Sequence, residues 1–253
     1  MSLSYSSLFR QKQGQRAFTV AYMAKYVPLA RIVSSDMPVL DIGCGWGHLL
    51  EALVNSSIPC LGIDTCEGQI AEATAHGCPA IYVADSLAWV REQGAAGRRW
   101  STIFLMDVLE HLESDRQIDL LHSLHEILPQ GGRLVIKCPN PDSAVGIRMA
   151  FSDYTHRFTP TADALEDVLA ALGFNSIRIG DELPWGDTPN IGIRPMFLLG
   201  TPETRKKSRH DLFYAVSQTV FRTVRRWQIA SEIGLEAARG LPLTPNFLCI
   251  AEK

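Results

Sequence analysis

The fold is decided by one stretch, which reads Val39-Leu40-Asp41-Ile42-Gly43-Cys44-Gly45-Trp46-Gly47-His48-Leu49-Leu50. A short apolar segment ends with an acid, three glycines follow at alternate positions, and an apolar helical pattern begins. Glycine has no Cβ, so its backbone adopts positive φ and can lie directly against a ligand. A strand, a glycine turn and a helix in this order predict a nucleotide-like ligand at the carboxyl end of the first strand of an open α/β sheet.

The spacing of the glycines narrows the choice of ligand. The dinucleotide pattern G-x-G-x-x-G fits poorly, because His48 stands where its third glycine would fall. Asp41 would repel a pyrophosphate, but it suits a ligand that carries an ammonium and a sulfonium. The pattern Asp41-x-Gly43-x-Gly45-x-Gly47 resembles the first motif of the class I S-adenosylmethionine (SAM) methyltransferases. The alternative is a tight turn that binds no ligand.

Further strand and helix patterns follow in the order that this resemblance implies. We expect strands at Cys60–Asp64, Ala80–Ser86, Thr102–Asp107, Arg133–Lys137, Ser176–Ile179 and Asn246–Ala251. Helical patterns lie between them at His48–Asn55, Glu67–Ala75, Ser86–Gln93, Arg116–Leu128 and, with Thr159 as its N-cap, Thr161–Leu172. The stretch after Pro139 reads as irregular. This alternation predicts an α/β fold, a Rossmann-like seven-stranded, mostly parallel sheet with helices on both faces.

Three parts of the chain are expected. Residues 1–36 form an N-terminal helical cap over the cofactor, residues 37–180 and 246–253 form the SAM-binding domain, and residues 181–245 form a helical insertion. Such a long connection is unusual for a structureless loop. Within it, Arg205–Ala230 is predicted to be a basic amphipathic element that helps to recognise the acceptor. The alternatives are a helix packed on its own domain with a solvated basic face, and a helix at a membrane surface.

Composition is that of an ordinary globular chain. The 253 residues are 46% hydrophobic and carry a formal charge of −3, which argues against a nucleic-acid partner. Six scattered cysteines with no C-x-x-C pair are typical of free thiols in a reducing compartment. Residues 1–10 lack the features of a secretory signal, and no apolar run approaches the length of a membrane span. We therefore expect a cytoplasmic protein, with peripheral contact to the inner membrane face as the alternative.

The resemblance assigns the cofactor-binding residues one by one. Gly43, Gly45 and Gly47 would allow close backbone approach, and Asp41 would lie on the methionyl ammonium side. Asp64 follows the glycine turn by roughly 20 residues, the usual offset for a carboxylate that binds ribose hydroxyls. The remaining assignments are Asp85 with the backbone of Ala84 and Ser86 at the adenine, and Met106 with Asp107 beside the methionyl group.

Two histidines are candidates for acceptor chemistry. Val108-Leu109-Glu110-His111-Leu112 resembles a stretch of the ubiquinone-type methyltransferases, and His111 would lie where the acceptor approaches the methyl group. Its ordinary pKa near 6.5 suits a general base at neutral pH. His156 lies in Asp153–Pro160, which resembles a loop that lines the acceptor cleft in glycan-locus methyltransferases. The alternative is that either histidine only caps a helix or orders its loop.

A metal site is a third interpretation of the same residues. Asp107, Glu110 and His111 are spaced so that one helical turn would place them on one side, and His156 would complete the set. The pattern resembles the metal motif of ubiquinone O-methyltransferases and small-RNA 2′-O-methyltransferases, and a divalent ion there would lower the pKa of an acceptor hydroxyl. The chain departs from that motif, because Asp107 replaces the first glutamate. We therefore expect SAM alone, without a metal.

These features predict a SAM-dependent methyltransferase that modifies a hydroxyl. Pro139-Asn140-Pro141-Asp142-Ser143 and the Asp153–Pro160 loop look most like enzymes of bacterial polysaccharide and natural-product clusters. A sugar hydroxyl of a glycan or glycolipid precursor is therefore the first choice of acceptor. The alternatives are a small phenolic or quinone-precursor hydroxyl, and a non-catalytic subunit that binds a partner through residues 181–245.

Overall fold

A single seven-stranded sheet organises the protein in the computed structural model, which describes residues 16–182, 220, 223–232, 234–235, 238 and 241–253. The strands lie in the order β3-β2-β1-β4-β5-β7-β6. Their bounds are β1 Val39–Ile42, β2 Cys60–Asp64, β3 Ala80–Tyr82, β4 Thr102–Met106, β5 Arg133–Pro139, β6 Asn175–Asp181 and β7 Asn246–Glu252. The first five strands pair in parallel, and β7 runs antiparallel to both β5 and β6. The predicted mostly parallel sheet is confirmed.

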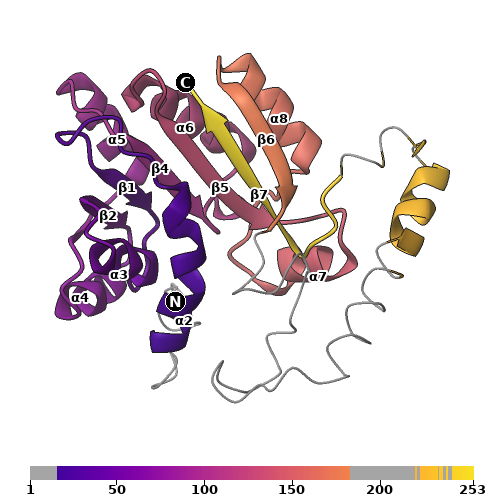
Figure 1. The fold of residues 1–253 in the computed structure, drawn as a ribbon, viewed down its shortest axis with the longest axis horizontal. Helices are drawn as coiled ribbons and strands as arrows, with labels where there is room; N and C mark the ends of the chain where they lie inside the picture. Colours follow the sequence, from indigo (N-terminus) through magenta and orange to yellow (C-terminus); the bar gives the residue numbers. More distant parts are fainter. Residues whose placement is uncertain (1–15, 183–219, 221–222, 233, 236–237, 239–240) are drawn as a thin grey trace.

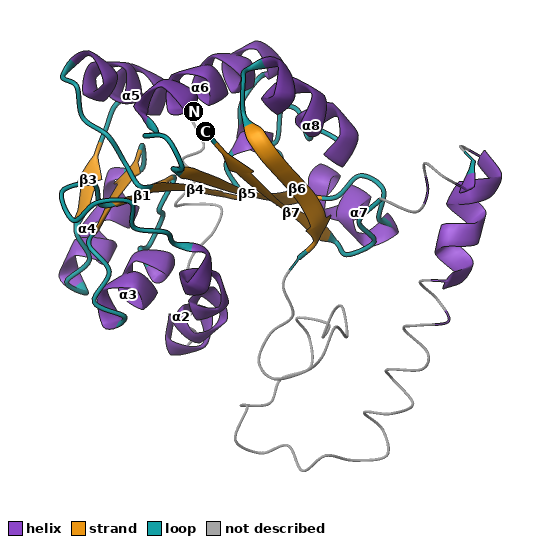
Figure 2. Cartoon of the chain, turned by 45° about the horizontal axis from the view of Figure 1, so that its top comes forward, coloured by secondary structure: helices purple, strands orange, loops and turns teal. Residues whose placement is uncertain are grey.

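Helices cover both faces of this sheet (Figure 1, Figure 2). One face carries α2 Arg16–Met23, α3 His48–Asn55 and α4 Glu67–Ala75, with the 3₁₀ helix η1 Ala24–Leu29 continuing α2. The other face carries α5 Ser86–Ala95, α6 Ser114–Ile127 and α8 Ala162–Ala171. The short 3₁₀ helix η2 Leu109–His111 and the helix α7 Ala144–Ser152 follow β4 and β5, at the carboxyl ends of the parallel strands.

The central strands are buried on both faces, as parallel strands between two helical layers must be. Every residue of β1 and of β4 is buried. The core on the α5–α6–α8 side includes Ile103, Leu105 and Leu124, and the opposite side includes Phe104 and Tyr26. The resulting rigid sheet presents its carboxyl-terminal edge as the platform for the site.

Two local predictions were wrong. The stretch after Pro139 contains the helix α7 instead of irregular chain. This helix packs so closely that a Cβ on Gly146 would lie 2.0 Å from the carbonyl oxygen of Asn140, so the glycine that weakens the helical pattern is required by the packing. The cap of α8 is Thr161 instead of Thr159, because the Thr161 hydroxyl accepts the Ala164 amide at 3.3 Å.

The predicted insertion is described only in part. Residues 223–232 are helical, and Arg225 and Arg226 donate to backbone carbonyls of Asp142 and Leu241 at 3.3 and 3.4 Å. Most of the predicted basic element lies outside the described residues, namely Arg205, Lys206, Lys207, Arg209 and Arg222. Within the described ranges, no helix is long and apolar enough to cross a membrane.

Candidate active site

The glycine turn connects β1 to α3 at the carboxyl edge of the sheet. Gly43 and Cys44 both donate their amides to the carbonyl of Ile63, at 2.8 and 3.0 Å, which fixes the turn against the end of β2. The Gly45 amide donates to Asp64 Oδ2 at 2.9 Å, and the Cys66 amide donates to Oδ1 of the same carboxylate at 2.7 Å. Asp64 therefore joins the two turns beside which a cofactor would lie.

Glycine is needed at each of the three positions of the turn for a different physical reason. All three adopt positive φ, at +70°, +53° and +75° for Gly43, Gly45 and Gly47. A Cβ on Gly43 would meet Val108 at 2.5 Å, and one on Gly47 would meet Ala73 at 2.9 Å. A Cβ on Gly45 would come no nearer than 3.5 Å to any described atom, the Gln69 amide oxygen. Gly45 thus keeps open a space that the described atoms leave unfilled, which is what close approach of a cofactor requires.

Two buried acids lie beside the glycine turn, Asp41 at the end of β1 and Asp64 at the end of β2. Asp41 is 2% exposed and Asp64 is 9% exposed. Burial, and then the charge of Asp64, raise the pKa of Asp41 to about 8. Burial also raises the pKa of Asp64, although the amides of Gly45 and Cys66 oppose that shift. A pair of desolvated carboxylates favours a cationic ligand, so the residues fit SAM, whose ammonium and sulfonium are both positive.

Asp85, the residue predicted to bind adenine, also has a structural role. Asp85 is the N-cap of α5, where its side chain accepts the Ala88 amide at 3.0 Å, and it also pairs with Arg116 at 2.7 Å. Ala84 and Ser86 flank it, Ala84 being exposed and Ser86 half-buried. The capping explains why an acid stands at this position, and the predicted contact with adenine stays a prediction.

Asp107 is held in an unusual way directly after β4. Its φ is +58°, a left-handed conformation that is uncommon for a residue with a side chain and is often found at functional sites. The buried Lys137 clamps it twice: Lys137 O accepts the Asp107 amide at 2.9 Å, and Lys137 Nζ lies 2.6 Å from Asp107 Oδ2. Met106 before it is buried at the end of β4. The Asp107 side chain remains 42% exposed, so it is fixed yet accessible.

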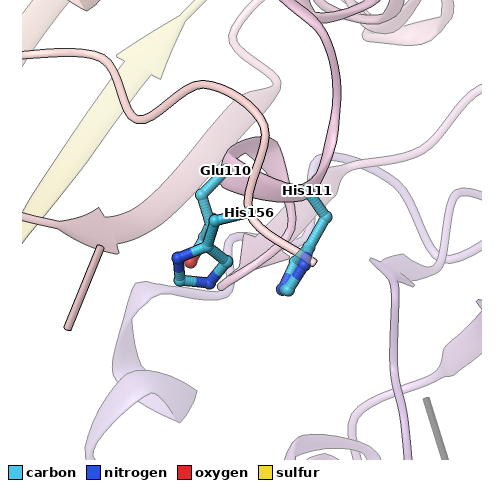
Figure 3. Close-up of side chains that lie close together, drawn as sticks. All are labelled: Glu110, His111 and His156. Carbon is cyan, nitrogen blue, oxygen red and sulfur yellow. The ribbon is translucent and has the colours of Figure 1, made fainter. Parts of the chain in front are cut away.

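Glu110, His111 and His156, which the sequence predicted to lie on the acceptor side, come together in the structure (Figure 3). The rings of His111 and His156 lie 4.7 Å apart at 70°, and one ligand atom from each of the three residues lies within 4.8 Å of the others. The loop that carries His156 is docked on η2, because the Arg157 amide donates to the carbonyl of Glu110 at 2.7 Å. Long-range backbone contact therefore builds this cluster.

The electrostatics of the cluster favour neutral groups. Burial, and then the charge of Asp107, raise the pKa of Glu110 to about 8. Burial and the neighbouring His156 lower the pKa of His111, while Asp153 and a hydrogen bond with the Thr155 backbone oppose that shift. A histidine with a lowered pKa is neutral at physiological pH and is therefore ready to accept a proton.

The same three side chains are suitable ligands for a divalent ion, which would polarise an acceptor hydroxyl there. The predicted four-residue set is wrong in one member. Asp107 does not share a helical turn with Glu110 and His111, because its left-handed backbone turns it toward Lys137 on the neighbouring strand. Only Glu110, His111 and His156 are grouped among the described residues.

A second buried cluster beside this site was missed from the sequence. Its centre is the carboxylate of Glu182, which accepts hydrogen bonds from Tyr22, Lys25 and Tyr26 of the N-terminal helices and from Asn246 of β7. Although burial opposes ionisation, the charges of Lys137 and Lys25 and the tyrosine hydroxyls lower the pKa of Glu182 to about 2. Lys137, a cation in the middle of the otherwise apolar segment Leu134–Cys138, was the one signal in the sequence for it.

The N-terminal helix is tied to the glycine turn as well. Arg16 on α2 donates to the carbonyl of Trp46 at 2.8 Å and pairs with Glu51 on α3 at 2.7 Å. Figure 1 shows α2 running beside α3 on the same side of the sheet. The described part of the predicted cap, from Arg16 onward, therefore lies against both halves of the site.

The chain is similar in sequence to relatives of known name. "Ubiquinone biosynthesis O-methyltransferase" of Bartonella bacilliformis is 25% identical over 189 residues, which cover 68% of this chain and 76% of the relative. The enzymes of the same name from Azorhizobium caulinodans and Mesorhizobium japonicum are 27% and 28% identical. Those alignments cover 54% and 61% of this chain, and only 58% and 65% of the relatives' length.

Solved structures share the fold. A SAM-dependent methyltransferase from Archaeoglobus fulgidus superposes with a TM-score of 0.68 at 22% identity, covering 99% of this chain and 100% of its own. The plantazolicin methyltransferase BpumL, solved with S-adenosylhomocysteine (SAH), superposes at 0.52 with 16% identity and coverage of 94% and 84%. The family described as "Methyltransferase domain" matches residues 14–179, well over half of the chain. The protein therefore belongs to this family and is a SAM-dependent methyltransferase.

Proposed function

We propose that the protein transfers the methyl group of SAM to a phenolic or quinone-precursor hydroxyl, with His111 as the general base. The observation that carries this proposal is the position of His111 beside Glu110 and His156, directly beyond β4 and close to the predicted methionyl side of the cofactor. A hydroxyl acceptor must lose a proton, and this cluster provides a half-buried, neutral imidazole that can take it.

Besides this base, methyl transfer requires few other groups from the protein. SAM, when bound, supplies a methyl group on a sulfonium that leaves as a neutral thioether. His111 takes the proton from the acceptor O–H as the acceptor oxygen forms its new bond to the methyl carbon, and the imidazolium later releases that proton to water. Asp107, which Lys137 holds by an ion pair, lies directly after β4 and helps to align the reacting groups.

The strength of the base favours a phenol over a sugar. A phenolic hydroxyl has an ordinary pKa of about 10, whereas an aliphatic hydroxyl is a far weaker acid. Because burial and His156 lower the pKa of His111, its neutral ring is a weak base and is better matched to the phenol. The names of the relatives, which act in ubiquinone biosynthesis, support the same choice. The weak base and these names together favour a phenolic acceptor over the sugar hydroxyl, which was the first choice from the loop motifs alone.

Direct assay of acceptors tests the proposal. Purified protein would be given SAM with a catechol, a simple phenol, an aliphatic amine and a nucleotide-linked sugar, and both SAH and the methylated product would be quantified. We expect product from the catechol or the phenol. Transfer only to the sugar or the amine would contradict the proposal. Repeating the assay after dialysis against EDTA separates a metal-free base from a metal held by Glu110, His111 and His156, because only the latter loses activity.

A further inference from the structure

The His111 ring is linked to a carboxylate through one hydroxyl group. Thr155 Oγ1 lies 2.9 Å from His111 Nδ1, and the same oxygen lies 2.6 Å from Asp153 Oδ1. The Thr155 amide also donates to Asp153 Oδ1, at 2.8 Å. Two donors from Thr155 therefore converge on one carboxylate oxygen, while the hydroxyl oxygen faces the imidazole.

The number of protons in this chain of contacts decides which ring nitrogen is protonated. An ionised carboxylate only accepts hydrogen bonds, and a threonine hydroxyl has a single proton to donate. That proton goes to Asp153, so the contact between Thr155 and His111 requires a proton on Nδ1. In a neutral imidazole the other nitrogen then carries the lone pair. For His111 this nitrogen is Nε2.

The neighbouring ring gives an internal comparison. His156 Nδ1 lies 2.8 Å from the backbone carbonyl of Ala150, which can only accept, so this ring is also protonated on Nδ1. A backbone carbonyl cannot be removed by substitution. For His111, the Thr155 Oγ1 that lies against Nδ1 is a side-chain atom, so this contact can be removed by substitution while the hydrogen bond between the ring and the Thr155 backbone stays in place.

We propose that Thr155 and Asp153 are positioning residues that hold His111 in its Nδ1-protonated form and so make Nε2 the basic nitrogen that faces the acceptor. The consequence for catalysis rests on the proposed function of His111. The tautomer itself does not, and it can be measured without any substrate.

Nuclear magnetic resonance of the imidazole nitrogens tests the tautomer. Protein with ¹⁵N-labelled histidine would be examined at pH 8, above the ordinary histidine pKa of about 6.5. The His111→Gln variant identifies the His111 signals among the seven histidines. We expect the Nδ1-protonated form in the wild type and in Thr155→Ser. Thr155→Val should shift His111 toward the Nε2-protonated form that free histidine prefers. An unchanged His111 tautomer in Thr155→Val would overturn the proposal.

A second variant guards against a simple loss of packing. Asp153→Ala retains the Thr155 hydroxyl but frees its proton, which can then turn toward Nδ1 of His111. We expect this variant to shift the tautomer in the same direction as Thr155→Val. If Asp153→Ala instead retained the Nδ1-protonated form, the link through Thr155 would be refuted even if Thr155→Val misfolded.

Kinetics separate this inference from the proposed function. Thr155→Val should lower kcat about 10- to 100-fold, the usual effect of losing such a supporting hydrogen bond, with the KM for SAM unchanged. Thr155→Ser should retain most of the activity. Thr74→Val is the matched control, because that hydroxyl donates only to the carbonyl of Ile70 in its own helix. A shifted tautomer with an unchanged kcat would support the positioning of the ring and refute His111 as the base.

Discussion

The two halves of the site are built by different means. On the cofactor side, backbone amides carry the geometry, and the contact from Gly45 to Asp64 spans only 19 residues of sequence. On the predicted acceptor side and in the neighbouring Glu182 cluster, side chains carry it, and they come from distant segments. Thr155 and His111 are 44 residues apart, and Tyr22 and Glu182 are 160 apart.

This difference matches the two ligands: the cofactor is common to the family, whereas the acceptor varies between enzymes. Backbone amides and glycines tolerate few substitutions, so they suit a cofactor that does not change. Side chains delivered by loops and terminal helices can be exchanged one at a time, which suits an acceptor that differs between enzymes. The variants below test this division, beginning with the largest expected effect.

Gly45→Val should abolish SAM binding and largely preserve the fold. The new side chain would fill the space that the described atoms leave open beside Gly45, and the positive φ adds strain of about 1–2 kcal/mol. Calorimetry with SAM and a thermal melt measure the two effects. Gly97→Val is the matched control, because Gly97 has a φ of +72° and a Cβ there would meet no described atom within 4 Å. SAM binding by the Gly45 variant would show that the turn is merely structural.

His111→Ala should lower turnover about 10²- to 10⁴-fold and leave SAM affinity nearly unchanged. The reason is that the acceptor half, unlike the cofactor half, acts through this single ring. Steady-state rates and SAM titrations give both numbers. His76→Ala, on an exposed histidine at the end of α4, is the control for loss of an imidazole. A comparable loss of SAM affinity would mean that the two halves are not separable.

Asp41→Asn should weaken SAM binding about tenfold and stabilise the protein without SAM. A folded-state pKa of about 8, against an ordinary 3.8, means that the folded chain holds a proton that the unfolded chain has lost. Wild-type stability should therefore fall as the pH rises from about 4 to 8, and a cationic ligand should bind more tightly over the upper part of that window.

Melting curves and SAM titrations at pH 6, 7 and 8 measure both trends for Asp41. The Asn variant cannot ionise there, so both trends should flatten. If the wild type showed neither trend while the variant still lost affinity, the carboxylate would be acting through shape instead of charge.

Arg225→Gln with Arg226→Gln should change the kinetics least. Both guanidinium groups donate to backbone carbonyls of this chain, so we expect a loss of stability of about 1 kcal/mol and unchanged KM values. Melting, acceptor kinetics and flotation with anionic liposomes are the measurements. A raised acceptor KM would instead support the predicted basic element as part of acceptor recognition, and lost flotation would support a membrane contact.

The sequence predicted the elements around the glycine turn well because the rules that form them are local. The succession of strands along the chain, the bounds of α3 and α4, and the turn at Gly43–Gly47 all follow from local sequence patterns. The acceptor half was predicted only as a set of candidate residues. Glu110, His111 and His156 do meet, but no periodicity could show that Asp107 would turn away to Lys137.

Long-range contacts explain the rest of what was missed. Gly146 lowered the helical signal of α7, although packing against Asn140 requires it. Glu182 was placed in the predicted helical insertion of residues 181–245, and its tyrosine and lysine donors lie in a helix at the other end of the chain. Nothing in the residues adjacent to either position reveals these partners.

The hydrogen bonds at the two ends of the segment 183–242 have a consequence for protein engineering. Asp181 Oδ1 accepts the amides of Leu243 and Thr244, at 2.6 and 3.1 Å, and the Glu182 amide donates to the Thr244 hydroxyl at 2.9 Å. The chain thus leaves the sheet and rejoins it at one joint, where residues 181–182 are hydrogen-bonded to residues 243–244. The entropy of closing a loop grows only with the logarithm of its length, so a joint of this kind tolerates segments of very different size. It is a natural point at which to graft a segment from one enzyme onto the sheet of another.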